Sequence, residues 1–192
     1  LCYNVPVLHT LLTDSRARAL YIFPTKALAH DQLHTLQRWL DGLGGERSAA
    51  AYDGDTPRAQ RRDIRQSADL LVSNPDMLHV GLLPYHPRWQ AFLSQLRYVV
   101  IDELHTYRRV FGSHVANVLR RLKRVCRFHG SDPQFICCSA TIANPVELAG
   151  NLLEEPVTLI ADNGAPRGER HLAFYNPPVI DPQLGLRRNL LL

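Results

Sequence analysis

The chain has 192 residues, of which 45% are apolar and 21% charged, a composition typical of a soluble globular domain with one core. No apolar run reaches the roughly 20 residues that a membrane span needs, so no membrane partner is expected. The net charge of +4 favours a polyanionic partner without establishing one. The four cysteines have no CxxC spacing, which argues against a zinc site, and free thiols favour the cytoplasm, with nucleoid association if the source is bacterial.

Short apolar runs alternate along the chain with longer stretches of helical spacing. The runs predict strands over 19–23, 49–52, 70–73, 98–101, 135–138 and 157–160. The clearest helical stretches are 26–43 and 113–127. Thr56-Pro57 and Asn144-Pro145 are expected to begin further helices, since a polar cap followed by proline is typical of a helix start. Pro6 is expected to kink the opening helix or to mark its first turn.

This alternation predicts an α/β fold, in which a parallel sheet carries helices on both faces. Cys137 and Cys138 lie in an apolar run and are expected to be small buried core residues. From residue 161 onward, proline and glycine become frequent, which predicts an extended strand around 171–175 and then an interdomain linker. We therefore expect a domain over 1–161 and a strand-and-linker segment over 162–192.

The strongest chemical signal is the run Val99-Val100-Ile101-Asp102-Glu103-Leu104-His105, in which an apolar strand ends in two adjacent carboxylates. The carboxyl ends of the strands form the ligand crevice of an open parallel sheet. Asp102 is therefore a candidate ligand for Mg²⁺, and Glu103 is a candidate to polarise an attacking water in phosphoryl transfer. The alternative is a pair of solvated acids that cap the following helix.

Four other junctions between a strand and a helix carry small polar residues. Ser139-Ala140-Thr141 offers two hydroxyls that can hydrogen-bond the acidic pair. Phe23-Pro24-Thr25-Lys26 offers backbone amides and side-chain donors to a phosphate. Tyr52-Asp53-Gly54-Asp55-Thr56 and Ser73-Asn74-Pro75 are junctions of the same kind. Several such turns along one sheet edge can follow a phosphate backbone without reading bases, although each alone is equally typical of an ordinary cap or turn.

In this order the five segments PTKAL, YDGDT, SNPDML, DELH and SAT resemble the motifs of superfamily 2 helicases. Residues 105–116 and the segment SATIANP narrow the resemblance to DExH helicases of the bacterial YprA type, the mitomycin repair helicases, and their fungal RecQ-four-like relatives. The resemblance implies the first RecA-like domain of an ATP-dependent DNA helicase that moves 3′ to 5′ in DNA repair. It also implies ATP and Mg²⁺ as cofactors and DNA, single-stranded or at a duplex junction, as partner.

The resemblance further implies roles for individual residues. Asp102 corresponds to the magnesium-holding acid, Glu103 to the residue that activates water, and His105 to the histidine that links the nucleotide to the DNA side. Ser139 and Thr141 correspond to the coupling motif. The positions that correspond to contacts near the DNA backbone are Thr25, Lys26, Gly54, Asp55, Ser73, Asn74 and Pro75.

One departure from the family pattern is large, because the phosphate loop GxxxxGK[ST] (Walker A) is not in the chain. We expect it immediately upstream of Leu1, and we expect the second RecA-like domain of the same protein beyond the connector 181–188. The fragment alone is then expected to be inactive. Two alternatives stay open: a helicase that acts on RNA, and a nucleic-acid-binding module without ATPase activity, against which the intact Asp102-Glu103 pair argues.

Two arginine-rich segments and two tryptophans complete the candidates. The segment 120–124 is interpreted as a solvated or interdomain face, with DNA contact as the minority alternative. The arginines at 58, 61, 62 and 65 follow YDGDT and have a stronger case for DNA contact. Trp39 and Trp89 are expected to pack against the core rather than to stack on bases.

Overall fold

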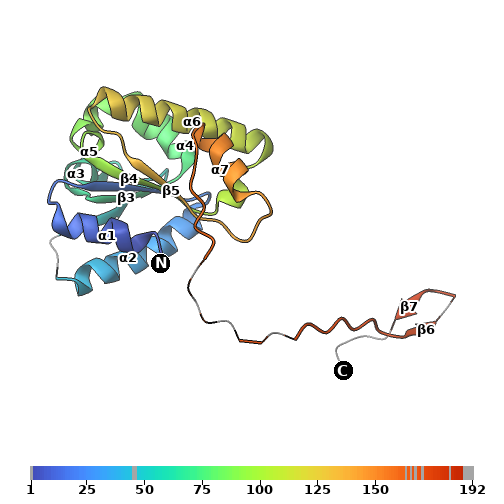
Figure 1. The fold of residues 1–192 in the computed structure, drawn as a ribbon. Coiled ribbons are helices and arrows are strands. Elements are labelled where there is room, and N and C mark those ends of the chain that lie inside the picture. Colours follow the sequence, from blue (N-terminus) through green and yellow to red (C-terminus); the bar gives the residue numbers. More distant parts are fainter. Residues whose placement is uncertain are drawn as a thin grey trace. The chain divides into compact units, whose positions relative to one another are not determined.

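The structure is a computed structural model, and it describes residues 2–44, 47–162, 164, 166, 168–169, 171–181 and 183–187. The chain divides into two compact units, Leu1–Leu159 and Ile160–Leu192. The first unit contains a five-stranded sheet with helices on both faces (Figure 1). The α/β class that the sequence predicts is therefore confirmed.

All five strands of this sheet are parallel, and their order is β2-β3-β1-β4-β5. The strands are β1 (Arg18–Ile22), β2 (Ala49–Ala51), β3 (Leu70–Ser73), β4 (Leu96–Ile101) and β5 (Gln134–Cys137). The chain runs outward from β1 to β2, returns through β3, and then crosses β1 to reach β4 and β5. Because the direction of winding reverses beside β1, the crevice at the strands' carboxyl ends opens there.

Helices connect the strands and cover the sheet. The helical elements are α1 (Asn4–Thr13), α2 (Lys26–Gly42), α3 (Gln60–Ser67), α4 (Pro75–Met77), η1 (Leu78–Leu82), η2 (Leu83–Trp89), α5 (Gln90–Leu93), η3 (Leu104–Thr106), α6 (Arg109–Phe128) and α7 (Pro145–Leu153). In Figure 1, α1 and α2 lie on one face of the sheet, and α6 lies on the other. None of the helices in the described part of the chain is long and apolar enough to span a membrane.

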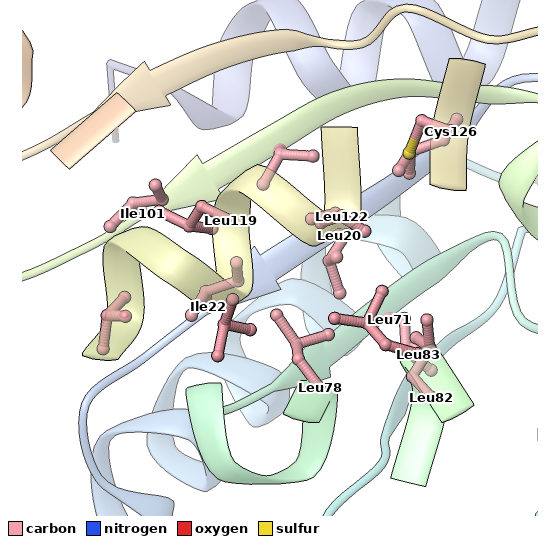
Figure 2. Close-up of a cluster of buried hydrophobic side chains, with 14 of the residues drawn as sticks. Leu20, Ile22, Leu71, Leu78, Leu82, Leu83, Ile101, Leu119, Leu122 and Cys126 are labelled. Carbon is pink, nitrogen blue, oxygen red and sulfur yellow. The ribbon is translucent and has the colours of Figure 1, made fainter. Parts of the chain in front are cut away.

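Alternate residues of each strand supply two separate cores. On one face Leu20 and Leu71 pack with Leu119 and Leu122 of α6, as Figure 2 shows. On the other face the residues that lie between them, such as Tyr21 and Val100, pack against α1 and α2. Because both faces are covered, the strands are apolar along most of their length instead of alternating. The same packing buries Trp89 fully and Trp39 partly, as expected from the sequence.

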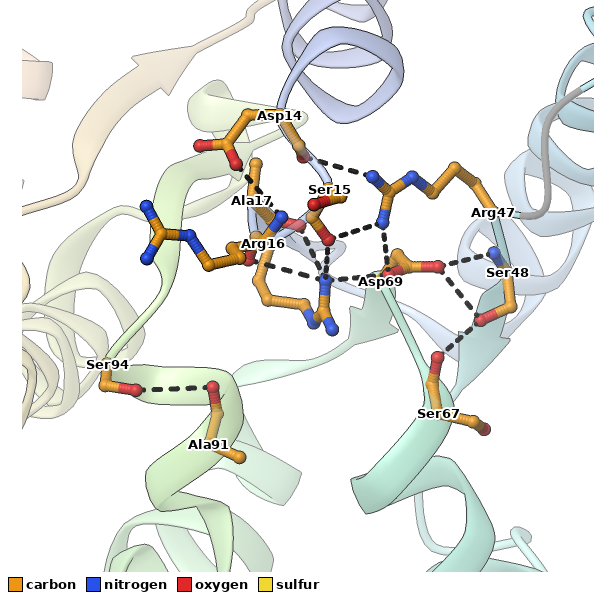
Figure 3. A network of polar contacts seen from close by, with 11 residues as sticks. Asp14, Ser15, Arg16, Ala17, Arg47, Ser48, Ser67, Asp69, Ala91 and Ser94 are labelled. Atoms are coloured by element: carbon orange, nitrogen blue, oxygen red, sulfur yellow. Dashed lines mark hydrogen bonds and ion pairs between the residues drawn. The ribbon is translucent and has the colours of Figure 1, made fainter.

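A buried polar cluster closes the amino end of the sheet. Asp69, just before β3, accepts hydrogen bonds from the Arg47 guanidinium (3.0 Å) and the Ser48 backbone N–H (2.9 Å). Figure 3 shows Arg47 and Ser48 around this carboxylate. The Arg18 guanidinium lies 2.7 Å from it. This cluster ties β1, β2 and β3 together at the edge opposite the candidate site, and it satisfies a carboxylate that burial would otherwise destabilise.

The structure corrects several sequence predictions about elements. Five of the expected strands and both long helices form with slightly different ends, but the expected strand at 157–160 does not. An extended strand around 171–175 is also wrong; the second unit instead pairs β6 (Val179–Asp181) with β7 (Leu186–Arg187) in antiparallel fashion. Leu159, Ile160 and Phe174 are exposed. The apolar composition of these segments therefore predicted strands wrongly, because no neighbouring strand pairs with them. Residues 182 and 188 of the expected connector lie outside the described residues.

Helix starts and the cysteines give a mixed outcome. Pro145 begins α7 and Pro6 lies in the first turn of α1, as expected. Pro57 does not begin a helix, because α3 starts only at Gln60 and the Thr56 hydroxyl is used inside the preceding turn. Cys137 and Cys138 are partly rather than fully buried.

Candidate functional site

The candidate residues lie in the turns that leave the carboxyl ends of the five parallel strands. Because these ends meet at one edge of the sheet, strand order decides which turns become neighbours. The turns after β4 and β5 hold the acidic pair and the SAT segment. The turns after β1, β3 and β2 hold the PTKAL, SNPDML and YDGDT segments. The edge is thus divided into an acidic half and a half with the expected phosphate-tracking turns.

Asp102 is held on both of its carboxylate oxygens. Its backbone N–H extends the sheet by bonding Ile22 O at 3.1 Å. Oδ2 accepts a hydrogen bond from the Tyr3 hydroxyl at 2.8 Å, and Oδ1 accepts one from the Glu103 backbone N–H at 2.8 Å. Burial, together with the Asp102 charge and hydrogen bond, raises the pKa of Tyr3 well above its usual value, so Tyr3 stays a neutral donor. The sequence did not single out Tyr3, because it lies 99 residues from Asp102.

Glu103 occupies a strained backbone position. Its φ of 53° and ψ of 43° are left-handed, which is uncommon for a residue other than glycine. This conformation turns the chain sharply from β4 into η3 and leaves the carboxylate about one third exposed (36%). Strain of this kind persists only where the surrounding structure enforces it, and it clusters at functional sites.

His105 connects Glu103 to the SAT segment. Its Nε2 lies 3.2 Å from Glu103 Oε2, and its Nδ1 lies 3.3 Å from the backbone nitrogen of Ala140. Ala140 N–H can only donate, so Nδ1 is the acceptor and Nε2 carries the proton that faces Glu103. One imidazole ring thus bridges Glu103 and the backbone of the segment after β5.

The SAT hydroxyls are arranged differently from the expectation. No hydrogen bond joins Ser139 or Thr141 to the acidic pair in the part of the chain that the structure describes; the backbone of Ala140 makes the connection instead. The Ser139 hydroxyl is buried without a hydrogen-bond partner among the described residues, whereas Thr141 is exposed. A buried hydroxyl without a partner beside the acidic pair is a donor available for a ligand or a rearranged state.

On the other half of the edge, Lys26 and Asp55 form an ion pair. Lys26 Nζ lies 2.7 Å from Asp55 Oδ2, and this hydrogen bond raises the pKa of Lys26. Thr25 caps α2, its hydroxyl oxygen accepting from Leu28 N–H at 3.4 Å. A Cβ added at Gly54 would lie 3.4 Å from Lys26 Nζ, an ordinary contact distance, so the lysine side chain lies against the turn at Gly54. The structure thus joins the PTKAL and YDGDT segments through their charged side chains.

Asp53 organises the turn between β2 and α3. Its buried carboxylate accepts hydrogen bonds from the backbone N–H groups of Asp55 (2.9 Å) and Thr56 (3.1 Å) and from His30 Nε2 (3.0 Å). Burial alone would raise the pKa of Asp53, but the bonds from Asp55 and His30 outweigh it and lower the pKa. Arg61 closes the turn by donating to Thr56 O at 3.0 Å. An aspartate before Gly-Asp-Thr is typical of such a self-bonded turn, so this residue was detectable in the sequence.

Ser73 and Asn74 are committed to internal bonds. The Ser73 hydroxyl donates to Tyr52 O at 2.6 Å, and Asn74 Oδ1 accepts from Met77 N–H at 2.8 Å as the cap of α4. Pro75 is the first residue of that helix. These three residues shape the edge, whereas Lys26, Gly54 and Asp55 are exposed on it.

The family model of the DEAD/DEAH box helicases matches residues 1–149. The chain belongs to the DEAD/DEAH box helicase family. Within this family the chain is 55% identical over 189 residues to the uncharacterized ATP-dependent helicase YprA of Bacillus subtilis. It is 42% identical over 196 residues to the ATP-dependent helicase HRQ1 of Saccharomyces cerevisiae. The alignments cover 98% and 100% of this chain but 25% and 18% of those relatives, so it spans a quarter of their length or less.

Solved helicase structures agree with this assignment. The DUF1998 helicase MrfA bound to DNA and AMPPNP superposes with a TM-score of 0.91 at 55% identity, covering 97% of this chain and 26% of that one. Mss116p bound to ssRNA and AMP-PNP matches with a TM-score of 0.61 at 20% identity, over 77% of this chain and 30% of that one, and shares only the fold. The resemblance to YprA-type helicases, their fungal relatives and the first RecA-like domain is confirmed.

Proposed function

We propose that this chain is the first RecA-like motor domain of an ATP-dependent DNA helicase. The observation that carries the proposal is the contact chain from Glu103 through His105 to the Ala140 backbone, which joins a water-activating acid to the SAT segment. The 55% identity to MrfA, whose solved structure contains DNA and AMPPNP, supports the same function. The motor domain is assigned to 1–161 and the strand-and-linker segment to 162–192.

The residues after β4 fit a magnesium–nucleotide site. Mg²⁺ prefers hard oxygen ligands and is usually bound through one or two carboxylates together with phosphate oxygens and water. Asp102 offers such a carboxylate, oriented by Tyr3 and by the Glu103 N–H. When bound, Mg²⁺·ATP supplies the phosphoryl group and neutralises its charge. Glu103, the residue next to Asp102, would accept a proton from water. His105 holds the Glu103 carboxylate through Nε2.

Coupling between hydrolysis and movement is assigned to the residues that follow β5. His105 takes its orientation from the Ala140 N–H, so a shift of Glu103 changes the force on the SAT backbone. Ser139, buried without a partner among the described residues, and the exposed Thr141 are free to change partners with the nucleotide state. The proposed route of coupling thus runs through the imidazole rather than directly from hydroxyl to acid.

The nucleic-acid side is assigned to the turns after β1, β3 and β2, with Lys26, Gly54 and Asp55 exposed and Thr25, Ser73, Asn74 and Pro75 supporting them. Contacts of this type grip phosphates and do not read bases. DNA is favoured over RNA because MrfA was solved with DNA at 55% identity, whereas the ssRNA-bound relative shares only the fold. The finer parts of the proposal are 3′-to-5′ movement, a role in DNA repair and a cytoplasmic location.

The proposal is tested with the full-length protein that carries this domain. We expect its ATP hydrolysis to require Mg²⁺ and to be stimulated by single-stranded DNA more than by RNA of the same sequence. A tailed duplex with a 3′ overhang should be unwound, and one with a 5′ overhang should not. Stimulation by RNA alone would favour the RNA-helicase alternative, and the absence of any hydrolysis would favour a binding module.

A further inference from the structure

Four arginines lie on one side of α3 and of the turn before it. Helical spacing already begins in this turn, since the backbone N–H groups of Gln60 and Arg61 both bond Pro57 O. At 100° per residue, positions 58, 61, 62 and 65 fall within an arc of about 100°. No residue of α3 is buried, so this helix presents its charged face without covering much of the core.

Among the described residues, Arg61 alone of these four arginines has hydrogen-bond partners for its guanidinium group. Arg61 donates to Thr56 O (3.0 Å) and Gly54 O (3.5 Å), and its guanidinium lies 5.6 Å from the centre of the Tyr52 ring. Arg58, Arg62 and Arg65 form no ion pair or hydrogen bond through their guanidinium groups among the described residues. Arg58 and Arg62 are exposed and Arg65 is half-buried. We call these three residues the α3 arginine row.

The row lies next to the proposed nucleic-acid edge. The turn 53–56 leads directly into it, and Arg61 ties that turn to α3. β2 is one of the two edge strands of the five-stranded sheet, next to β3. The α3 arginine row therefore begins at Arg58, next to the turn that holds the exposed Gly54 and Asp55, and continues along α3 from there. Lys26 on the same edge is neutralised by Asp55.

We propose that the α3 arginine row is a second phosphate-binding stretch that extends the track of single-stranded DNA outward past β2. This inference rests on the proposed helicase function and adds a surface to it. The charge supports DNA as the occupant, since three guanidinium groups without acidic partners complement a phosphate backbone. Along the helix axis, Arg58 to Arg65 span about 10 Å, enough to meet more than one phosphate of a strand.

The α3 arginine row adds charge that the neighbouring turns lack. Because Lys26 is neutralised by Asp55, this pair brings no net charge to the turns after β1 and β2. The α3 arginine row supplies three positive charges, and none of them forms an ion pair among the described residues, although Asp63 lies on the same helix. Guanidinium forks hold phosphate oxygens with two parallel hydrogen bonds, which a lysine cannot do.

The test compares two triple variants of the full-length protein. In the first, Arg58→Gln, Arg62→Gln and Arg65→Gln are combined, leaving Arg61 and its turn intact. In the matched control, Arg16→Gln, Arg38→Gln and Arg127→Gln remove the same charge from exposed arginines that lie toward the amino ends of the strands. Fluorescence anisotropy with a long and a short single-stranded DNA is measured over a range of salt concentrations.

We expect the row variant to bind the long DNA about 10-fold more weakly, with the slope of log affinity against log salt reduced by about 2, since each lost single-strand contact contributes about 0.7. The short DNA and the control variant should behave as the wild type. A row variant with the wild-type slope would overturn the proposal and point to another partner, such as an acidic protein. A wild-type protein that binds no DNA would instead refute the proposed function itself.

Folding is checked separately. The thermal midpoint of the row variant should match that of the wild type, because none of the three side chains holds another element. If the triple variant melts early, the single variant Arg62→Gln is used, since that side chain is exposed. It should lower the slope by about 0.7 on long DNA. If Arg62→Gln keeps the wild-type slope of log affinity against log salt, the proposal that the α3 arginine row binds phosphates is overturned.

Discussion

Glu103 combines an uncommon backbone conformation with a carboxylate that is about one third exposed and faces His105. Replacing it by Gln keeps the shape, and the amide oxygen can still accept the hydrogen bond from His105 Nε2. It removes the base, so ATP hydrolysis by the full-length protein should fall at least about 100-fold while ATP binding persists. Steady-state hydrolysis and nucleotide binding measured side by side check this. Wild-type turnover in the Gln variant would remove Glu103 from the catalytic assignment.

Tyr3 allows the orientation of Asp102 to be tested by removing one atom, because its hydroxyl donates a hydrogen bond to Asp102 Oδ2 at 2.8 Å. Tyr3→Phe removes that bond and keeps the ring, which packs edge-on against Tyr21 with centroids 5.6 Å apart. The Mg²⁺ concentration needed for half-maximal nucleotide binding should rise several-fold, since a carboxylate left to rotate binds the ion less well. Binding is measured with a fluorescent nucleotide.

A purely structural tyrosine would give another pattern. Tyr3→Phe would then lower the thermal midpoint while leaving the Mg²⁺ dependence unchanged. Tyr21→Phe is the matched control, because its hydroxyl bonds Asn4 Oδ1 rather than Asp102. The control should leave the Mg²⁺ dependence at the wild-type value.

At the level of elements, the segment after β5 is where hydrolysis and movement are expected to be linked. Replacing both Ser139 and Thr141 by Ala leaves the Ala140 backbone bond to His105 in place. Basal ATP hydrolysis should therefore remain within about twofold of wild type, while DNA unwinding is strongly reduced. Equal loss of both activities would indicate misfolding, and unchanged unwinding would exclude the coupling role.

The turn between β2 and α3 depends on a carboxylate whose pKa is lowered by its hydrogen bonds. Such a group stabilises the fold above its ordinary pKa of 3.8, and the contribution disappears as the pH falls through the lower pKa of the folded state. Asp53→Asn should thus lower the unfolding free energy at pH 7 by about 1–2 kcal/mol. Urea titrations should show the difference shrinking toward pH 3; a constant difference at all pH values would contradict the assignment.

Taken together, the two halves of the sheet edge describe only part of a motor. The chain has no GxxxxGK[ST] segment, whose backbone N–H groups and lysine cradle nucleotide phosphates. We predict that the 192-residue chain alone does not hydrolyse ATP and binds DNA weakly, with steep salt dependence. An ATPase assay and a DNA titration at two salt concentrations check this. Multiple turnovers by the isolated chain would contradict the prediction.

Some features of this protein are local, and the sequence alone determined them. Short apolar runs between stretches of helical spacing predicted the parallel α/β fold. A strand that is buried on both faces of a sheet is apolar along nearly its whole length, and such a run can be recognised in the sequence. The DELH, SAT and PTKAL segments indicated the helicase family, since each consists of contiguous residues. Asp53 was also within reach, because its carboxylate bonds the backbone N–H groups of Asp55 and Thr56 in its own turn, although its bond to His30 could not be predicted locally.

Tertiary structure alone decided how these segments meet. Strand order, not chain order, divides the sheet edge into an acidic half and a half with the exposed Lys26 and Gly54. Tyr3 reaches Asp102 across 99 residues, and Ala140 rather than a hydroxyl contacts His105. Apolar runs at 157–160 and 171–175 formed no strands, because a strand needs a partner as well as a composition. Such contacts depend on packing between distant elements, which no local pattern encodes.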